Sequence, residues 1–316
     1  MSQTFEPSFE IHEKESRFHD AWASATDIAA VNVRAAFEAP TAVENHFILR
    51  LLGHLSGKHI LDVGAGLGES SVYFALQGAQ VTCTDLSPSM VETAARLARR
   101  HGVEISTVVS AGETLDVPAN AFDIAYIANT IHHVTNKPSL FGQVRRALKP
   151  GGMFVSIDPL AYNPVIEVYR RMATQVRTED EAPLTFADAK LAASYFDNVG
   201  HREFWIASLA LFLKYFAVDR VHPNQERYWK RILRETRESL RWWLPLRALD
   251  QCLTRVPGVR RLAWNMVMWG RKPQLAGART CHTCSWRSVP PYTYTRFFVS
   301  CGASGMKERW CTALNG

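Results

Sequence analysis

A glycine-rich turn carries the first chemistry visible in the sequence. The segment LDVGAGLGES, residues 61–70, follows a short apolar run and precedes a helix-forming segment. A strand that runs into a glycine turn and then a helix N-terminus is a layout that binds phosphate or carboxylate groups. Dinucleotide-binding turns need G-x-G-x-x-G spacing, whereas Gly64, Gly66 and Gly68 are followed here by Glu69. No Gly-Lys-Ser/Thr follows, as a P-loop requires. The turn is therefore Rossmann-like but not of the standard NAD type.

A second acidic position narrows the choice of nucleotide. Asp62 lies two residues before the first glycine, and Asp85 ends the next predicted strand. A carboxylate about twenty residues past the glycine turn accepts hydrogen bonds from ribose hydroxyls. This suits NAD or S-adenosylmethionine. The spacing D-x-G-x-G-x-G differs from that of turns that bind a pyrophosphate and favours S-adenosylmethionine. Backbone N–H groups at the start of a helix can bind the carboxylate of this cofactor.

Composition indicates a globular protein without a dedicated nucleic-acid surface. The chain has 316 residues, of which 47% are apolar and 21% charged, and its net charge of +6 arises mostly beyond residue 220. A modest, local excess of this kind argues against a nucleic-acid binder. The N-terminus lacks the features of a signal peptide, and the longest apolar run, residues 204–213, is too short to span a bilayer. We therefore expect a cytoplasmic location.

The order of predicted elements indicates the fold class. Helical spacing predicts two helices in residues 1–56, the second starting with a capping box of Thr41 and Glu44. Ser87 and Pro88 predict the start of another helix, which runs through residue 100. Strands are expected at 59–63, 79–85, 104–109, 122–127, 153–157, 202–207 and 262–269, and a long helical block at 209–259. Alternating strands and helices imply a parallel, doubly wound sheet.

These expectations define a fold and its domains. We predict an α/β protein with a Rossmann-like, doubly wound seven-stranded sheet, N-terminal helices and a helical insertion before the last strand. Residues 1–56 form a helical cap, and residues 57–273 form the cofactor-binding domain. Within that domain, residues 159–259 form a largely helical acceptor or lid region. Residues 274–316 are a cysteine-containing tail whose role stays open.

Four segments carry a family resemblance. They are LDVGAGLGE, TDLSPSMV, AGETLDVPANAFDIAYIANTIHHV and RRALKPGGMFVSID. In order and spacing they are similar to the successive motifs of class I S-adenosylmethionine-dependent methyltransferases, in particular the ubiquinone/menaquinone-biosynthesis and related small-molecule branch. The resemblance covers residues 40–160 strongly and residues 160–273 in outline. It implies S-adenosylmethionine as cofactor and a small-molecule or lipid-like acceptor, with no nucleic-acid substrate.

The same resemblance assigns residues to parts of the cofactor. Asp85 would bind the ribose, Leu86 would lie against the adenine face, and Gly112 would face the adenine edge. Many relatives carry Asp at the position of Ala111, where Glu113, two residues further on, is the candidate substitute. The remaining contacts, at the methionine end, fall to Asp62, Gly64, Ala65, Gly66, Gly68 and Asn129.

Catalytic candidates follow the fourth and fifth predicted strands. His132 and His133 lie at the C-terminal edge of the sheet, where ligands bind in open α/β folds. A neutral imidazole there can accept a proton from the acceptor as the methyl group is transferred. The other interpretation is that both histidines only hold the loop, since methyl transfer can need alignment alone. Tyr162 is the third catalytic candidate.

The segment 226–243 allows two interpretations. At helical spacing, one face carries Trp229 and Trp243, and the adjoining face carries Lys230, Arg234 and Arg241. We favour a lid helix that packs on the domain. Tryptophan beside a basic face is also typical of an interfacial membrane helix. The alternative function is therefore a catalytically silent binding protein of this fold, docked on an anionic membrane.

The tail contains four of the six cysteines, namely Cys281, Cys284, Cys301 and Cys311. Four thiolates can hold zinc, but the second pair lacks C-x-x-C spacing. We therefore predict no metal site.

Overall fold

The computed structural model describes residues 6–174, 178, 181–234 and 237–274. By its contacts the chain divides into two compact units, Met1–Pro273 and Gln274–Gly316. The four tail cysteines, and with them the zinc alternative, lie outside the described residues.

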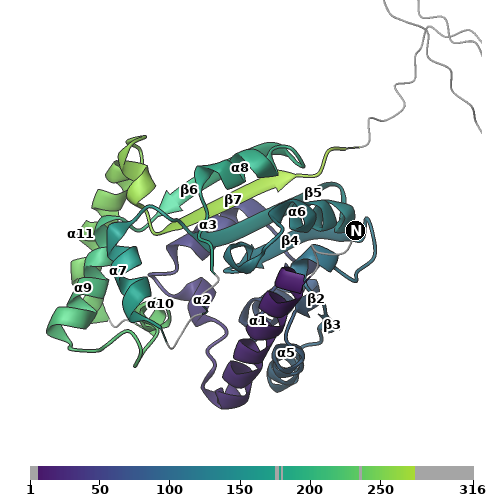
Figure 1. Cartoon of the computed structure of the whole chain (residues 1–316), viewed down its shortest axis with the longest axis horizontal. Coiled ribbons are helices and arrows are strands. Elements are labelled where there is room, and N and C mark those ends of the chain that lie inside the picture. Colours follow the sequence, from purple (N-terminus) through teal and green to yellow (C-terminus); the bar gives the residue numbers. More distant parts are fainter. Residues whose placement is uncertain (1–5, 175–177, 179–180, 235–236, 275–316) are drawn as a thin grey trace, which may run out of the picture. The chain divides into compact units, whose positions relative to one another are not determined.

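The first unit is built on one seven-stranded sheet (Figure 1). The strand order is β3-β2-β1-β4-β5-β7-β6. The strands are β1 (His59–Val63), β2 (Gln80–Asp85), β3 (Ser106–Val109), β4 (Phe122–Ala128), β5 (Leu148–Pro159), β6 (Asp197–Phe204) and β7 (Asn265–Arg271). The predicted number of strands and the α/β class are confirmed.

The expected parallel, doubly wound sheet is confirmed for β1 to β5, but the edge formed by β7 and β6 is antiparallel. β1 to β5 pair in parallel, but β7 lies antiparallel to both β5 and β6. β6 and β7 are consecutive in the chain and neighbours in the sheet, and antiparallel neighbours need no crossover connection over the face of a sheet. The insertion between them therefore stays at the end of the strands instead of covering a face.

Helices cover both faces of the sheet, as a doubly wound fold requires. On β4, Ile124 and Tyr126 belong to one buried cluster, and Ala125 and Ile127 to the other. This alternation follows from the two-residue period of a strand. The helices are α1 (Glu6–Ala25), α2 (Ala35–Glu38), α3 (Val43–Leu52), α4 (Glu69–Leu76), α5 (Pro88–Arg100), α6 (Lys137–Ala147), α7 (Pro164–Met172), α8 (Phe186–Ala192), α9 (Ala210–Leu213), α10 (Tyr228–Arg231) and α11 (Arg237–Leu253).

Capping was predicted correctly for α5 and wrongly for α3. The Ser87 hydroxyl accepts a hydrogen bond from Met90 N at the start of α5. Thr41 instead donates to the carbonyl of Ile232 at 2.7 Å, outside its own helix. Glu44 accepts from Asn265 Nδ2 at 2.8 Å. Long-range partners therefore replaced the local capping box and tie α3 to the insertion and to β7.

The helical block predicted at 209–259 is divided into several short helical elements followed by the longer helix α11. A π-helical stretch spans Lys214–Val218, and a 3-10 turn at Ile232–Arg234 follows α10 directly. The segment 226–240 is therefore not one continuous amphipathic helix. Within the described part of the chain, no helix is both long and apolar enough to cross a membrane.

Candidate active site

A cavity of about 700 Å³ lies at the C-terminal ends of the parallel strands. Its lining includes the glycine turn after β1, the end of β2 and the residues that follow β4. In the strand order β3-β2-β1-β4-β5, the chain reverses direction across the sheet between β1 and β4. Open α/β sheets bind ligands at such a switch point. The cavity is therefore where the fold itself predicts a ligand.

The three glycines of the turn are required for different structural reasons. Gly64 has φ +67°, and a Cβ there would lie 2.3 Å from Thr130 Oγ1. Gly66 has φ +55° and lines the cavity, and a Cβ there would meet no described atom within 4 Å. A Cβ on Gly68 would lie 2.5 Å from the Cβ of Ala94 on α5. Gly68 thus permits α4 to pack on α5, while Gly66 leaves open space beside the backbone.

Asp62 supports the glycine turn from the interior of the protein. Its side chain is buried outside the cavity lining, and Asp62 Oδ2 accepts a hydrogen bond from Ser71 Oγ at 2.7 Å. Burial raises the pKa of this carboxyl to about 7. Asp62 and Gly68 were expected to contact the cofactor directly. In the structure both lie behind the residues that line the cavity, where they support the turn. Gly64, Ala65 and Gly66 do line the cavity.

Asp85 joins the end of β2 to the glycine turn. Its Oδ2 accepts from Gly66 N and its Oδ1 accepts from Ser87 N, each at 2.9 Å. Burial raises the pKa of Asp85, and the two backbone N–H groups oppose this rise. The carboxylate lines the cavity next to Leu86, as the sequence predicted.

The remaining predicted cofactor residues also line the cavity. Asn129 has φ +52°, and its backbone N donates to Ile157 O at 2.7 Å. Gly112 begins a short 3-10 turn where a Cβ would lie 2.8 Å from Leu140. Glu113 Oε1 accepts from Thr135 N at 3.2 Å. The Glu113 carboxylate is therefore already engaged with the loop after β4.

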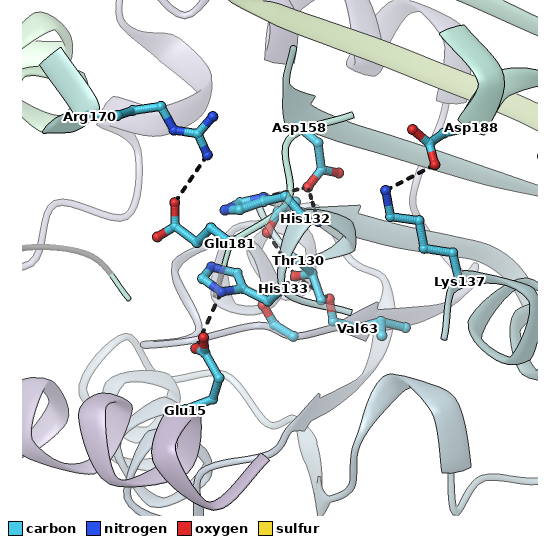
Figure 2. A network of polar contacts seen from close by, with 12 residues as sticks. Glu15, Val63, Thr130, His132, His133, Lys137, Asp158, Arg170, Glu181 and Asp188 are labelled. Atoms are coloured by element: carbon cyan, nitrogen blue, oxygen red, sulfur yellow. Dashed lines mark hydrogen bonds and ion pairs between the residues drawn. The ribbon is translucent and has the colours of Figure 1, made fainter. Parts of the chain in front are cut away.

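His132 is held by a buried carboxylate. His132 Nδ1 lies 2.8 Å from Asp158 Oδ1, and the same oxygen accepts from the backbone N of His132 at 3.2 Å. Burial raises the pKa of Asp158 above its usual range. Figure 2 shows the opposite edge of the His132 ring directed toward Glu181, and both residues line the cavity. The arrangement fixes one ring nitrogen and presents the other for proton transfer.

Helix α1 brings functional groups that the sequence analysis missed. His12, Glu15, His19 and Trp22 line the cavity, at the three- or four-residue spacing of one helix face. Burial by itself raises the pKa of Glu15, but His133 and His19 outweigh it and hold this pKa well below the usual range. In the sequence, the recurrence of His12, Glu15 and His19 at helical spacing was the feature that could have indicated this polar face. The predicted cap is therefore a wall of the site.

Tyr162 is not brought to the cavity. Its side chain is 37% exposed, its ring stacks on Phe186 at 5.7 Å, and its hydroxyl accepts from Phe186 N at 3.4 Å. It lies outside the cavity lining. Of the three catalytic candidates, the structure brings His132 and His133 together, with ring centroids 4.2 Å apart.

The insertion closes the cavity from the other side. Lys230 forms an ion pair with Glu69 at 3.1 Å, and Arg227 lies 4.0 Å from the centroid of the Trp22 ring. Trp229 also lines the cavity, and Trp243 is fully buried. The tryptophans predicted for one apolar face therefore pack inward, which agrees with the lid interpretation of this segment.

Comparisons with known proteins agree with this geometry. Residues 61–156 match the family described as "Methyltransferase domain". The chain is 31% identical over 131 residues to a ubiquinone/menaquinone biosynthesis C-methyltransferase of Psychromonas ingrahamii, a match covering 39% of this chain and 52% of that protein. It is 35% identical over 103 residues to phosphoethanolamine N-methyltransferase 1 of Arabidopsis thaliana, covering 32% of this chain and 21% of the relative. The chain thus spans about half or less of these relatives.

A solved structure shows the same fold. Haemonchus contortus phosphoethanolamine N-methyltransferase 2, in complex with S-adenosyl-L-methionine, superposes with a TM-score of 0.51 at 18% identity, covering 74% of this chain and 53% of that one. Together with the strand order and the glycine turn, these matches confirm the resemblance. Residues 61–156 therefore match a methyltransferase domain, and the fold around them is shared with a solved S-adenosylmethionine-bound methyltransferase.

Proposed function

We propose that the protein transfers the methyl group of S-adenosylmethionine to a small-molecule or lipid-like acceptor. The observation that carries the proposal is one cavity lined by Gly66, Asp85, Asn129 and His132 together. These residues come from three different strand ends, and their convergence needs the whole fold. The named activities of the relatives, on a quinone precursor and on phosphoethanolamine, support the same reaction class.

The residues present fit this cofactor. The open space at Gly66 leaves room for a ligand against the backbone, and Asp85 offers a buried carboxylate for two ribose hydroxyls. A volume of about 700 Å³ is large within the range of roughly 300–1,000 Å³ that small-molecule sites occupy. It therefore leaves room for an acceptor beside the cofactor.

The chain's own residues then supply alignment and proton transfer. When bound, S-adenosylmethionine supplies an activated methyl group through its sulfonium. With Asp158 ionised, the Nδ1–H of His132 donates to it, so Nε2 carries the lone pair that accepts a proton from the acceptor. Helix α1 and the segment 227–234 line the cavity and would reduce the access of water to the bound reactants.

Part of the cavity lining is aromatic. It includes Phe37, Tyr126, Tyr169, Trp205 and Trp264. Aromatic walls of this kind suit an acceptor with an apolar body. They favour a lipid-like or ring-containing molecule as the acceptor.

The test is direct. Calorimetry of the full chain with S-adenosylmethionine should give one binding site, and mass spectrometry of a metabolite or lipid extract incubated with methyl-labelled donor should show a labelled product. Absence of saturable binding would contradict the cofactor assignment. Binding without any labelled product across polar and lipid extracts would instead favour the catalytically silent alternative.

A peripheral membrane contact belongs to the same proposal, at α11. Trp242 is 73% exposed, and Leu249, one heptad further on, is also exposed, with Arg241 and Arg255 exposed nearby. Exposed tryptophan, leucine and arginine side chains in and directly after one helix suit an anionic membrane. We expect sedimentation with vesicles containing phosphatidylserine, weakened by salt and by Trp242→Ala. Equal sedimentation with neutral vesicles, or none with either, would refute the contact.

A further inference from the structure

Three side chains from two distant parts of the chain point their donor atoms at one another. Glu15 and His19 lie one turn apart on α1, and His133 follows β4. One ligand-type atom from each residue lies within 4.8 Å of those of the other two. Glu15 Oε2 is 3.3 Å from His133 Nδ1 and 3.5 Å from His19 Nε2. All three residues line the cavity.

Hydrogen bonding does not explain this arrangement. The Glu15 side chain is only 5% exposed, yet neither of its carboxylate oxygens has a hydrogen-bond partner among the described residues. His133 Nδ1 has none either. N–H···O bonds usually span 2.7–3.2 Å. The two imidazoles compensate the buried charge of Glu15 only when they are protonated; a metal ion between the three side chains would compensate it with both imidazoles neutral.

Metal coordination does explain the spacing. Nitrogen and carboxylate ligands lie about 2.0–2.2 Å from zinc, so neighbouring ligands in a tetrahedral shell are about 3.4 Å apart. The two measured separations, 3.3 and 3.5 Å, bracket this value. Two imidazoles and one carboxylate are also a ligand set that catalytic zinc sites use, with a fourth position open.

The ligands are held in place without a metal. Next to His19, Asp20 Oδ1 accepts from Ser87 Oγ at 2.5 Å and from Ser89 N at 3.1 Å, which anchors α1 at the start of α5. His133 lies in a 3-10 turn whose neighbour His132 is fixed by Asp158. Figure 2 shows His133 between Glu15 and Glu181, with His132 beside it. When the ligand side chains are already in place, ion binding costs less conformational entropy.

We propose that Glu15, His19 and His133 form a binding site for a divalent transition metal, with Zn²⁺ as the best match. The softer nitrogen donors favour Zn²⁺ over Mg²⁺, which prefers an all-oxygen shell. The site joins α1 to the loop after β4 and leaves its open position toward the cavity. If the proposed methyl transfer holds, a hydroxyl or thiol of the acceptor bound at that position would have a lowered pKa and would pass its proton to His132, whose ring lies beside His133.

The experiment measures metal binding itself. Chelator-treated full-length chain, with Cys281, Cys284, Cys301 and Cys311 changed to Ser to remove tail thiolates, is titrated with Zn²⁺ by calorimetry. We expect one equivalent to bind, and His19→Ala and His133→Ala each to weaken binding at least tenfold. His12→Ala is the matched control, because this histidine lines the same cavity from α1 but lies outside the three-residue group. It should bind Zn²⁺ as the parent does.

Two further readouts make the result decisive. Co²⁺ bound at the site should give the visible absorption of nitrogen and oxygen ligands, and Zn²⁺ should slow hydrogen exchange in α1. The proposal is overturned if no stoichiometric binding occurs or if His12→Ala loses as much affinity as His19→Ala. Circular dichroism confirms that each variant is folded. S-adenosylmethionine binding, measured separately, keeps failure of the metal site distinct from failure of the proposed reaction.

Discussion

Asp85→Ala is expected to weaken S-adenosylmethionine binding by about 100-fold. The carboxylate is buried at the cavity wall and would accept both ribose hydroxyls. Hydrogen bonds to a charged group contribute about 1.5–3 kcal/mol each. Loss of two at the lower bound is about 3 kcal/mol, which corresponds to roughly a hundredfold change in Kd. Calorimetry with the purified variant measures it directly.

The controls separate ribose recognition from support of the turn. Asp85 also accepts from Gly66 N and Ser87 N, so its removal affects the glycine turn as well. Asp85→Asn keeps one acceptor oxygen and should give an intermediate loss. Glu92→Ala removes an exposed carboxylate on α5 and should leave the affinity unchanged. An Asp85→Ala protein that binds with parental affinity would remove Asp85 from the cofactor site.

The cofactor half of the site could be predicted because its signals are local. The glycine turn and Asp85 depend on spacing within two adjacent strand–turn units, which the sequence displays directly. Asp62 and Gly68, also predicted to contact the cofactor, lie behind the residues that line the cavity, and spacing alone does not distinguish a lining residue from one behind it. Only the close approach of Ala94 to Gly68 and the bond from Ser71 to Asp62 make that distinction.

The acceptor half could not be predicted, because its contacts join distant segments. Glu15 contacts His133, and Thr41 donates to the carbonyl of Ile232, over sequence separations of more than a hundred residues. Helical periodicity predicts α1 but does not say which element its polar face covers. The antiparallel direction of β7 likewise depends on pairing with β5, since a strand has the same period in both directions. Which segments line the acceptor half of the cavity therefore depends on tertiary packing.

His132→Ala is expected to lower kcat for methyl transfer by about 10²–10⁴, the usual contribution of a positioned general base. Cofactor affinity should change little, since its main contacts are assigned to Asp85 and the glycine turn. Burial raises the pKa of Asp158, and a protonated Asp158 no longer accepts from His132 Nδ1, so the imidazole no longer has its basic nitrogen at Nε2. Parental kcat should therefore rise with pH as this carboxyl ionises. The rise belongs to the coupled pair and not to either residue alone.

Comparison of pH profiles distinguishes a proton-transfer role from a structural one. With a labelled acceptor in hand, kcat of His132→Ala should be low and nearly flat over the pH range in which the parental rate rises. Asp158→Asn should also be slow and should lose that rise, because the amide does not ionise. Tyr162→Phe is the matched control, since this ring stacks on Phe186 outside the cavity lining and its hydroxyl contacts only backbone in the described structure. It should keep the parental rate and profile. If His132→Ala keeps the parental pH dependence at any rate, another group carries the proton, and His132 only holds the loop.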